Sequence, residues 1–167
     1  MATIEGDFST PNGRFAVVAS RFNALVTEAL LAGCQDTFAR HGVAADRIDV
    51  AWVPGSFEIP LVARTMAETG RYVAVICLGC VIRGETTHYD YVAGQAASGV
   101  QQASLASGLP VIFGIVTTET VEQALNRSGL KAGNKGSDAA LAAIEMANLM
   151  AKLRERGGGS FGFPGTA

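Results

Sequence analysis

The apolar run from Tyr72 to Ile82 constrains the fold of this chain more than any other segment. The run shows no alternation with polar residues, so the strand that it predicts is buried on both faces. Such strands occupy the middle of parallel sheets, whose helical connections cover both sides. The chain should therefore contain helices that alternate with strands.

Apolar runs and helical patterns do alternate along the chain, which is the signature of parallel βαβ units. Strands are predicted at 14–20, 48–53, 72–82 and 109–116, and helices at about 23–41, 56–70, 87–107, 120–128 and 137–156. We therefore expect a three-layer α/β/α sandwich around a four-stranded parallel sheet, with a flavodoxin-like architecture. Residues 1–156 would form this single domain.

Residues that favour helix ends mark several of these boundaries. Gly42 is a typical stop after a helix, and Ser56 and Ser137 are expected to cap the helices that follow them. Thr120-Val-Glu-Gln123 resembles a capping box at the start of a short helix. Between the last two helices, residues 129–136 are predicted to form a basic loop punctuated by glycines.

The helix predicted at 87–107 is rich in alanine, glycine and serine. Gly94 and Gly99 each cost this helix about 1 kcal/mol relative to alanine. Close packing of its backbone against another element is expected to compensate.

The two ends of the chain lie outside this core pattern. Residues 2–8 can form a strand, but they precede the first βαβ unit, so we expect them to pair with another subunit. Residues 157–167 are rich in glycine and are predicted to form a mobile tail.

The composition excludes several classes of protein. The 167 residues are 49% hydrophobic and 17% charged, which excludes a disordered chain. A net charge of −2 gives no reason to expect a nucleic-acid partner. No apolar run reaches the roughly 18 residues of a membrane span, and no basic-then-apolar leader opens the chain. A cytoplasmic protein without membrane contact is therefore expected.

Three cysteines make an odd count, which argues against a disulfide framework. Cys77 and Cys80 match a CxxC pattern, but residues three apart on a strand face opposite sides. They are expected to be buried thiols rather than a metal or redox pair, and Cys34 is interpreted in the same way. Because the two histidines are far apart in the sequence, no metal-ligand cluster is predicted.

Ligands of parallel sheets bind beyond the carboxyl ends of the strands. Four loops should converge there, at 21–23, 54–58, 83–88 and 117–119. Phe22 is an apolar ring in the first loop, and it can either stack on a ligand or pack within the loop. Glu58 can accept hydrogen bonds from a ligand, or it can be an ordinary acidic residue at a helix start.

The turn after the central strand matches the glycine spacing of a P-loop, at Gly79 and Gly84. Glu85, however, stands where a P-loop carries its lysine, and its carboxylate would repel nucleotide phosphates. NTP hydrolysis is therefore not expected. The glycines at 157–162 match the dinucleotide-binding spacing but follow a helix instead of a strand, so we interpret them as a coincidence.

A helix N-terminus follows this turn and is a favourable place for an anion. The backbone N–H groups at Glu85 and Thr86, with the Thr86 hydroxyl, can bind a phosphate. His88 begins the helix, where the dipole disfavours the imidazolium, so it is either a base near neutral pH or a plain surface histidine. Arg127 is the candidate cation for the phosphate, unless it only faces solvent, and Lys135 lies in the loop just beyond it.

Five segments of the chain occur in a familiar order and spacing between about Ile4 and Arg156. They are Arg21-Phe22-Asn23, Pro54 to Pro60, Gly84 to Asp90, Lys131 to Gly136 and Ala143 to Asn148. As a set they resemble the 6,7-dimethyl-8-ribityllumazine synthase family. Glu85 and Leu130 depart from the small residue and the threonine that are usual in the family.

The resemblance implies the penultimate step of riboflavin synthesis. In that step 5-amino-6-(D-ribitylamino)uracil condenses with 3,4-dihydroxy-2-butanone 4-phosphate to 6,7-dimethyl-8-ribityllumazine, with loss of phosphate and water. His88 would shuttle protons, and Glu85, Thr86 and Arg127 would hold the phosphate. The pyrimidine and its ribityl chain would contact Phe22, Asn23, Ser56, Phe57, Glu58, Val81, Ile82, Phe113 and Lys135. No cofactor and no metal is implied.

The resemblance also implies a homopentamer with active sites between neighbouring subunits. Arg127 and Lys135 would then come from the neighbour of the subunit that supplies His88. A neighbour's N-terminal strand would extend the sheet, and the 87–107 helix would pack around the five-fold axis. The short 129–136 loop resembles that of icosahedral 60-mer shells, in which riboflavin synthase can be an encapsulated partner.

Two other functions are compatible with the same scaffold. A non-catalytic protein that binds flavin or lumazine would keep Phe22 and Glu58 but should lose His88 or Arg127. A purely shell-forming protein would not need the pocket residues. The presence of His88 and Arg127 favours the enzyme.

Overall fold

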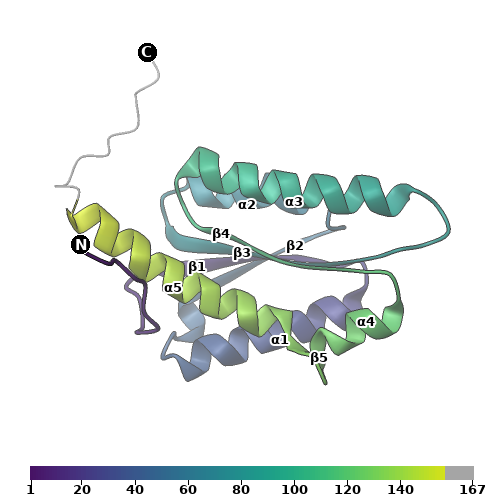
Figure 1. Ribbon diagram of the computed structural model, residues 1–167, viewed down its shortest axis with the longest axis horizontal. Helices are drawn as coiled ribbons and strands as arrows, with labels where there is room; N and C mark the ends of the chain where they lie inside the picture. The colour runs from purple at the N-terminus through teal and green to yellow at the C-terminus, as the bar shows by residue number, and fades with distance from the viewer. Residues whose placement is uncertain (157–167) are drawn as a thin grey trace, which may run out of the picture.

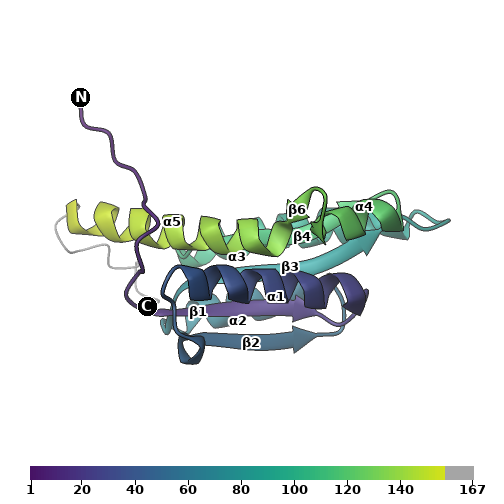
Figure 2. The same ribbon diagram turned by 90° about the horizontal axis from the view of Figure 1, so that it is seen from below.

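Four parallel strands in the order β2-β1-β3-β4 form the centre of the fold, which we describe from a computed structural model for residues 1–156. The strands are β1 (Arg14–Ser20), β2 (Ile48–Val53), β3 (Tyr72–Ile82) and β4 (Val111–Thr118). Figures 1 and 2 show helices on both sides of this sheet, so the predicted three-layer α/β/α sandwich is confirmed. The predicted tail at 157–167 lies outside the described residues.

The helices divide between the two faces of the sheet (Figure 1). One face is covered by α1 (Ala24–Arg40), α4 (Val121–Asn126) and α5 (Lys135–Arg156), and the other by α2 (Ile59–Glu68) and α3 (His88–Ser107). A single 3₁₀ turn, Ala45–Arg47, precedes β2. No helix among residues 1–156 is both long and apolar enough to cross a membrane.

The central strand β3 is buried on both faces, as its sequence predicts. Ala74, Ile76 and Leu78 pack into one core with residues of α1 and α5. The alternate residues of β3, such as Val75, pack into a second core with residues of α2 and α3. The absence of polar alternation in this strand therefore reflects two cores that share one strand.

The three cysteines are free, buried thiols. Cys77 lies in the core beneath α2 and α3, and Cys80 lies in the core beneath α1 and α5, so the CxxC pair faces opposite sides as predicted. Burial raises the pKa of the Cys34 thiol to about 12 and that of Cys80 to about 11. Burial also raises the pKa of Cys77. All three are thus protonated and unreactive at neutral pH.

Two predicted boundaries are wrong by a few residues. β4 begins at Val111 instead of Leu109 and runs to Thr118, because β3 continues to Ile82 and offers Thr117 and Thr118 partners. Ser56 does not cap the next helix: α2 starts at Ile59, after a turn in which the Glu58 N–H donates to the Gly55 carbonyl at 3.3 Å.

The predicted loop at 129–136 is instead a short antiparallel hairpin, β5 (Ser128–Leu130) with β6 (Gly133–Asn134). The predicted cap of α5 is also wrong. Oδ1 of Asn134 accepts from the N–H groups of Gly136 at 2.8 Å and Ser137 at 3.2 Å. The Ser137 hydroxyl donates to the Gly33 carbonyl on α1 instead. Packing of α5 on α1 therefore moves the start of the helix to Lys135.

Other local signals are confirmed. Thr120 and Gln123 form a complete capping box at the start of α4. Gly42 follows α1 with φ +76°, the left-handed conformation that glycine adopts without strain. Gly99 of α3 is packed closely, since a Cβ there would lie 2.6 Å from Pro60 Cβ, whereas Gly94 has open space around it in the single chain.

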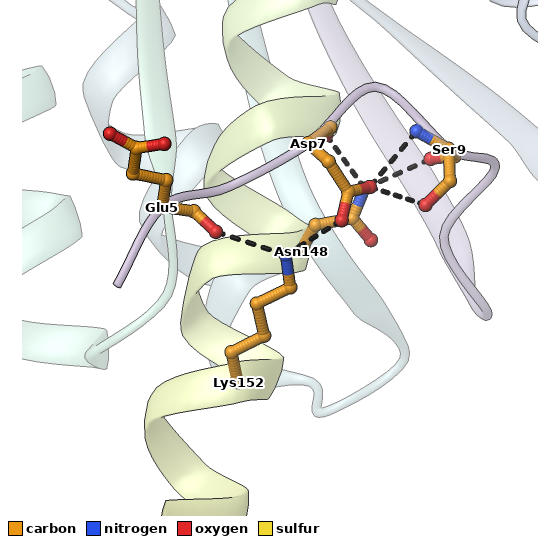
Figure 3. Close-up of polar contacts among 5 residues, drawn as sticks. All are labelled: Glu5, Asp7, Ser9, Asn148 and Lys152. Carbon is orange, nitrogen blue, oxygen red and sulfur yellow. Dashed lines mark hydrogen bonds and ion pairs between the residues drawn. The ribbon is translucent and has the colours of Figure 1, made fainter. Parts of the chain in front are cut away.

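The N-terminal segment forms no strand within residues 1–8 of this chain. It lies along α5, where Nδ2 of Asn148 donates to the carbonyls of Asp7 at 2.8 Å and Ser9 at 2.9 Å (Figure 3). Nζ of Lys152 donates to the Glu5 carbonyl at 3.0 Å. Pairing of residues 2–8 with another subunit stays a prediction.

Candidate active site

Three backbone and side-chain hydrogen bonds draw the predicted loops together at the carboxyl ends of the strands. The Arg21 N–H donates to the Val53 carbonyl at 2.8 Å, which joins the loop after β1 to the end of β2. Nδ2 of Asn23 donates to the Cys80 carbonyl at 2.9 Å, and the Arg83 N–H donates to the Thr118 carbonyl at 2.9 Å. The convergence expected for a parallel sheet is thus present, and we call this region the crevice.

Two aromatic rings stand in the crevice with much of their surface free. Phe22, just after β1, is 71% exposed, and Phe57, just after β2, is 56% exposed. Single exposed rings are common on protein surfaces, so this exposure leaves both rings free to contact a ligand without requiring one. Their position at the strand ends suits a flat, partly apolar ligand.

Asn23 helps to hold the crevice loops in place and also lies at the start of α1. It is the N-cap position of α1 with φ 59°, a left-handed conformation that asparagine tolerates better than most residues. Its amide nitrogen already donates to Cys80. The amide oxygen and the second N–H of the amide therefore remain available to a ligand.

Ser56 and Glu58 differ sharply in their exposure. The Ser56 hydroxyl is buried without a hydrogen-bond partner, and a Cβ at Gly79 would lie 2.6 Å from it. Glu58, one residue before α2, is exposed. Val81 is buried and Ile82 is half-buried at the end of β3, where they pair with Thr117 and Thr118 of β4.

The predicted phosphate loop lies at the start of α3. Glu85, Thr86 and His88 are all exposed, and His88 is the first residue of the helix. The Thr86 Oγ1 accepts a long hydrogen bond from the His88 N–H, at 3.4 Å. The free N–H groups of this first turn and the positive end of the helix favour an anion here.

A second group of predicted residues lines a cavity of about 720 Å³ beside the edge strand β4, and Thr117 and Thr118 at the end of that strand also line it. Arg127 lines this cavity from the end of α4, and Lys135 lines it from the start of α5. Lys131 adds a third positive charge. The cavity is therefore suited to an anionic group.

The two groups do not line one common cavity in the single chain. None of the crevice residues Phe22, Ser56, Glu58 or His88 lines the cavity. Phe113 belongs to neither place: it pairs with Cys77 in the middle of the edge strand, four residues before Thr117, and is 43% exposed. The single chain thus presents the predicted site as separate parts.

Two residues of the cavity were missed by the sequence analysis. Gln123 and Asn126 line it together with Arg127. Their spacing, three and four residues apart, places them on one face of α4, and this pattern could have indicated them. No group of three or more potential metal ligands occurs among residues 1–156.

The family model for 6,7-dimethyl-8-ribityllumazine synthase matches residues 12–151 of the 167. The chain belongs to this family. The matched range contains every residue that the sequence assigns to the site, from Phe22 to Lys135. Lumazine synthases are enzymes, so the exposed aromatic rings, the helix N-terminus with His88 and the basic cavity belong to a chain of a catalytic family.

Proposed function

We propose that this protein condenses 5-amino-6-(D-ribitylamino)uracil with 3,4-dihydroxy-2-butanone 4-phosphate to 6,7-dimethyl-8-ribityllumazine, with release of phosphate and water. The observation that carries the proposal is the pairing of an aromatic crevice with an anion-favouring helix start in a chain of the lumazine synthase family. A flat pyrimidine and a small phosphate ester are the two chemical types that such a pocket accommodates.

The roles of the crevice residues follow from their chemistry. Phe22 and Phe57 offer faces on which the pyrimidine stacks, and Glu58 accepts hydrogen bonds from its ribityl hydroxyls or ring N–H groups. The backbone at Val81 and Ile82 faces the ring edge. Ser56 supports this end of β3, since its hydroxyl is buried beside Gly79.

The phosphate group binds at the first turn of α3. The N–H groups around Glu85 and Thr86 and the Thr86 hydroxyl are its donors, which makes the Glu85 side chain unnecessary for binding. Arg127 supplies the balancing positive charge. This arrangement holds the ketone of the second substrate next to the amine of the first, so that condensation becomes effectively intramolecular.

His88 transfers the protons of the reaction. The amine adds to the ketone and water leaves to give an imine; phosphate is then eliminated, and the ring closes as the ribitylamino nitrogen attacks the new carbonyl with loss of a second water. These steps move protons at nitrogen and oxygen, and the elimination of phosphate also removes a proton from the adjacent carbon. An exposed imidazole beside the phosphate loop is placed to accept and return these protons. The reaction needs no redox cofactor.

Arg127 and Lys135 act in the site of a neighbouring subunit. The basic cavity supports this proposal, because Arg127 and Lys135 line it whereas Phe22, Ser56, Glu58 and His88 do not. A ring of chains related by rotation places the cavity of each subunit against the crevice of the next. We propose a pentamer, with a 60-mer shell and encapsulated riboflavin synthase as its further assembly.

A direct assay tests the reaction. The purified protein, mixed with both substrates, should form lumazine, followed by its absorbance and fluorescence. A histidine base operates at about pH 6 to 8. Absence of product throughout this range would contradict the proposed enzymatic activity. A protein that binds lumazine without forming it would support the non-catalytic alternative.

A mixing experiment tests the composite site. His88→Ala and Arg127→Ala proteins are dissociated, mixed and reassembled, and their activity is compared with each unmixed variant at low butanone phosphate. If the site lies between chains, random mixing restores intact sites at about a quarter of the interfaces. If both residues served the same site from one chain, mixing would restore none.

A further inference from the structure

Arg83, the residue that follows β3, contacts the first turn of α3 and the loop residue Glu119 just before α4. Its Nη2 and Nη1 donate to the two oxygens of Asp90 on α3, at 2.8 and 3.2 Å. Its Nε lies 2.8 Å from Oε2 of Glu119, which follows β4. Its Cζ lies 4.2 Å above the Tyr89 ring. The planar guanidinium thus holds two carboxylates and an aromatic face at once, a geometry that lysine cannot reproduce.

The ion pair of Arg83 with Asp90 joins the residue just before the proposed phosphate loop to a residue of the helix that follows it. Residues 84–87 lie between them, and within this stretch the side-chain bond from the His88 N–H to Thr86 is long. Thr87 occupies the N-cap position of α3 without a side-chain cap. The bidentate pair is therefore the main contact that sets the direction of the first turn of α3, and with it the position of His88.

The pair of Arg83 with Glu119 connects this loop to α4. Glu119 directly precedes the capping box of Thr120 and Gln123, and its own N–H donates to Oε1 of Gln123 at 2.9 Å. Arg127 lies at the other end of the same short helix. One guanidinium is thus tied to the start of both elements that carry the proposed phosphate ligands.

Arg83 is not itself a good phosphate ligand. Asp90 and Glu119 together carry two negative charges against its one, so the cluster offers an incoming anion no net attraction. The two carboxylates raise the pKa of Arg83, and Arg83 lowers the pKa of Asp90. The cluster is also partly exposed, with the Arg83 side chain 36% accessible, and ion pairs of that kind add little to stability. Its geometry is therefore better explained by positioning than by binding or stability.

We propose that Arg83 is a positioning residue of the condensation: it orients the phosphate loop 84–87 and His88 through Asp90, and it aligns α4 with that loop through Glu119. The proposal rests on the proposed function for its kinetic consequence. Its structural consequence, the order of the loop, can be measured without substrate.

The test compares Arg83→Gln with Arg83→Lys and with Arg40→Gln. The last variant removes an exposed arginine that pairs with Asp36 on α1, far from the crevice. Arg83→Gln should raise the KM for the butanone phosphate about tenfold, the effect of losing roughly one charge-assisted hydrogen bond, and lower kcat. The KM for the pyrimidine should stay within about twofold. Arg83→Lys should fall between, because an ammonium can reach only one carboxylate.

Hydrogen exchange of the substrate-free proteins separates the two arms of the network. Arg83→Gln should speed exchange at residues 84–90 and 120–127, Asp90→Asn mainly at 84–90, and Glu119→Gln mainly at 120–127. Exchange and kinetics of Arg83→Gln that match those of Arg40→Gln would overturn the positioning role and leave the proposed function intact. A wild-type protein that forms no lumazine would overturn the proposed function, while the exchange pattern still decides whether Arg83 orders the loop.

Discussion

Nζ of Lys152, near the end of α5, donates to the carboxylate of Asp7 at 2.7 Å and so joins the first residues of the chain to its last helix (Figure 3). The Asp7 carboxylate also accepts from Nδ2 of Asn148 at 3.1 Å and from the N–H and hydroxyl of Ser9. These contacts hold the N-terminal segment on α5. They therefore fix the direction in which the N-terminal residues, which we expect to reach another subunit, extend from α5.

The hydrogen bonds from Lys152 and Ser9 lower the pKa of Asp7 to about 2 from 3.8. A lowered carboxyl pKa means that the contact contributes its full stability above the unfolded pKa, near 4, and loses it as the pH falls toward 2. Asp7→Asn should therefore lower the thermal unfolding midpoint at neutral pH, and the difference from wild type should shrink below about pH 4. In a Lys152→Met background the same substitution should have a smaller effect; equal effects in both backgrounds would contradict the pairing.

Gly99 and Gly94 on α3 provide a matched pair of substitutions. Gly99→Ala should lower the free energy of unfolding by about 1–3 kcal/mol, because the new methyl overlaps the rigid ring of Pro60. Gly94→Ala should raise it by about 1 kcal/mol, since alanine is the better helix former and nothing lies within 4 Å. Chemical denaturation measures both. A destabilised Gly94→Ala would instead place a neighbouring chain against this face of α3.

His88→Ala should lower kcat by about 10²–10⁴-fold, the usual contribution of a positioned acid–base group. The assembly, measured by light scattering, should be unchanged, because the His88 side chain is exposed in the single chain. His41→Ala is the control, since His41 lies at the end of α1 and contacts the Thr37 carbonyl. If His88→Ala turned over as fast as the His41→Ala control, the proposed role of His88 in proton transfer would be wrong.

Arg127→Ala should raise the KM for the butanone phosphate far more than the KM for the pyrimidine. The expected change is about 10- to 100-fold, because a charge-assisted contact to a phosphate is lost. Steady-state kinetics with each substrate varied in turn measure this. Similar increases for both substrates would mean that Arg127 acts on the shape of the pocket rather than on the phosphate.

The elements of the fold were predictable because their signals are local. The continuous apolar run from Tyr72 to Ile82 predicts that β3 is buried on both faces. The capping box of α4 is recognisable within four residues. The crevice was also predictable, since parallel strands bring their carboxyl ends to one edge of the sheet. For these features the sequence pattern and the tertiary structure carry the same information.

The cap of α5 shows where local signals stop. Both Asn134 and Ser137 are acceptable N-cap residues. The choice falls on Asn134 because its amide also donates to the Ala29 carbonyl, 105 residues away, and because a Cβ at Gly136 would overlap the Leu30 carbonyl. The close approach of α5 to α1 thus selects the cap, and no spacing within residues 128–137 encodes it.

The pattern of apolar and polar residues was sufficient to predict the four strands of the sheet and its five helices to within a few residues, because burial of each element depends on its own periodicity. Only the tertiary structure decided which of the connecting loops meet. Asn23 reaches Cys80, Arg83 reaches Glu119, and Arg127 lines a cavity beside β4. These contacts depend on sheet register and helix docking, which join residues that are distant in the chain.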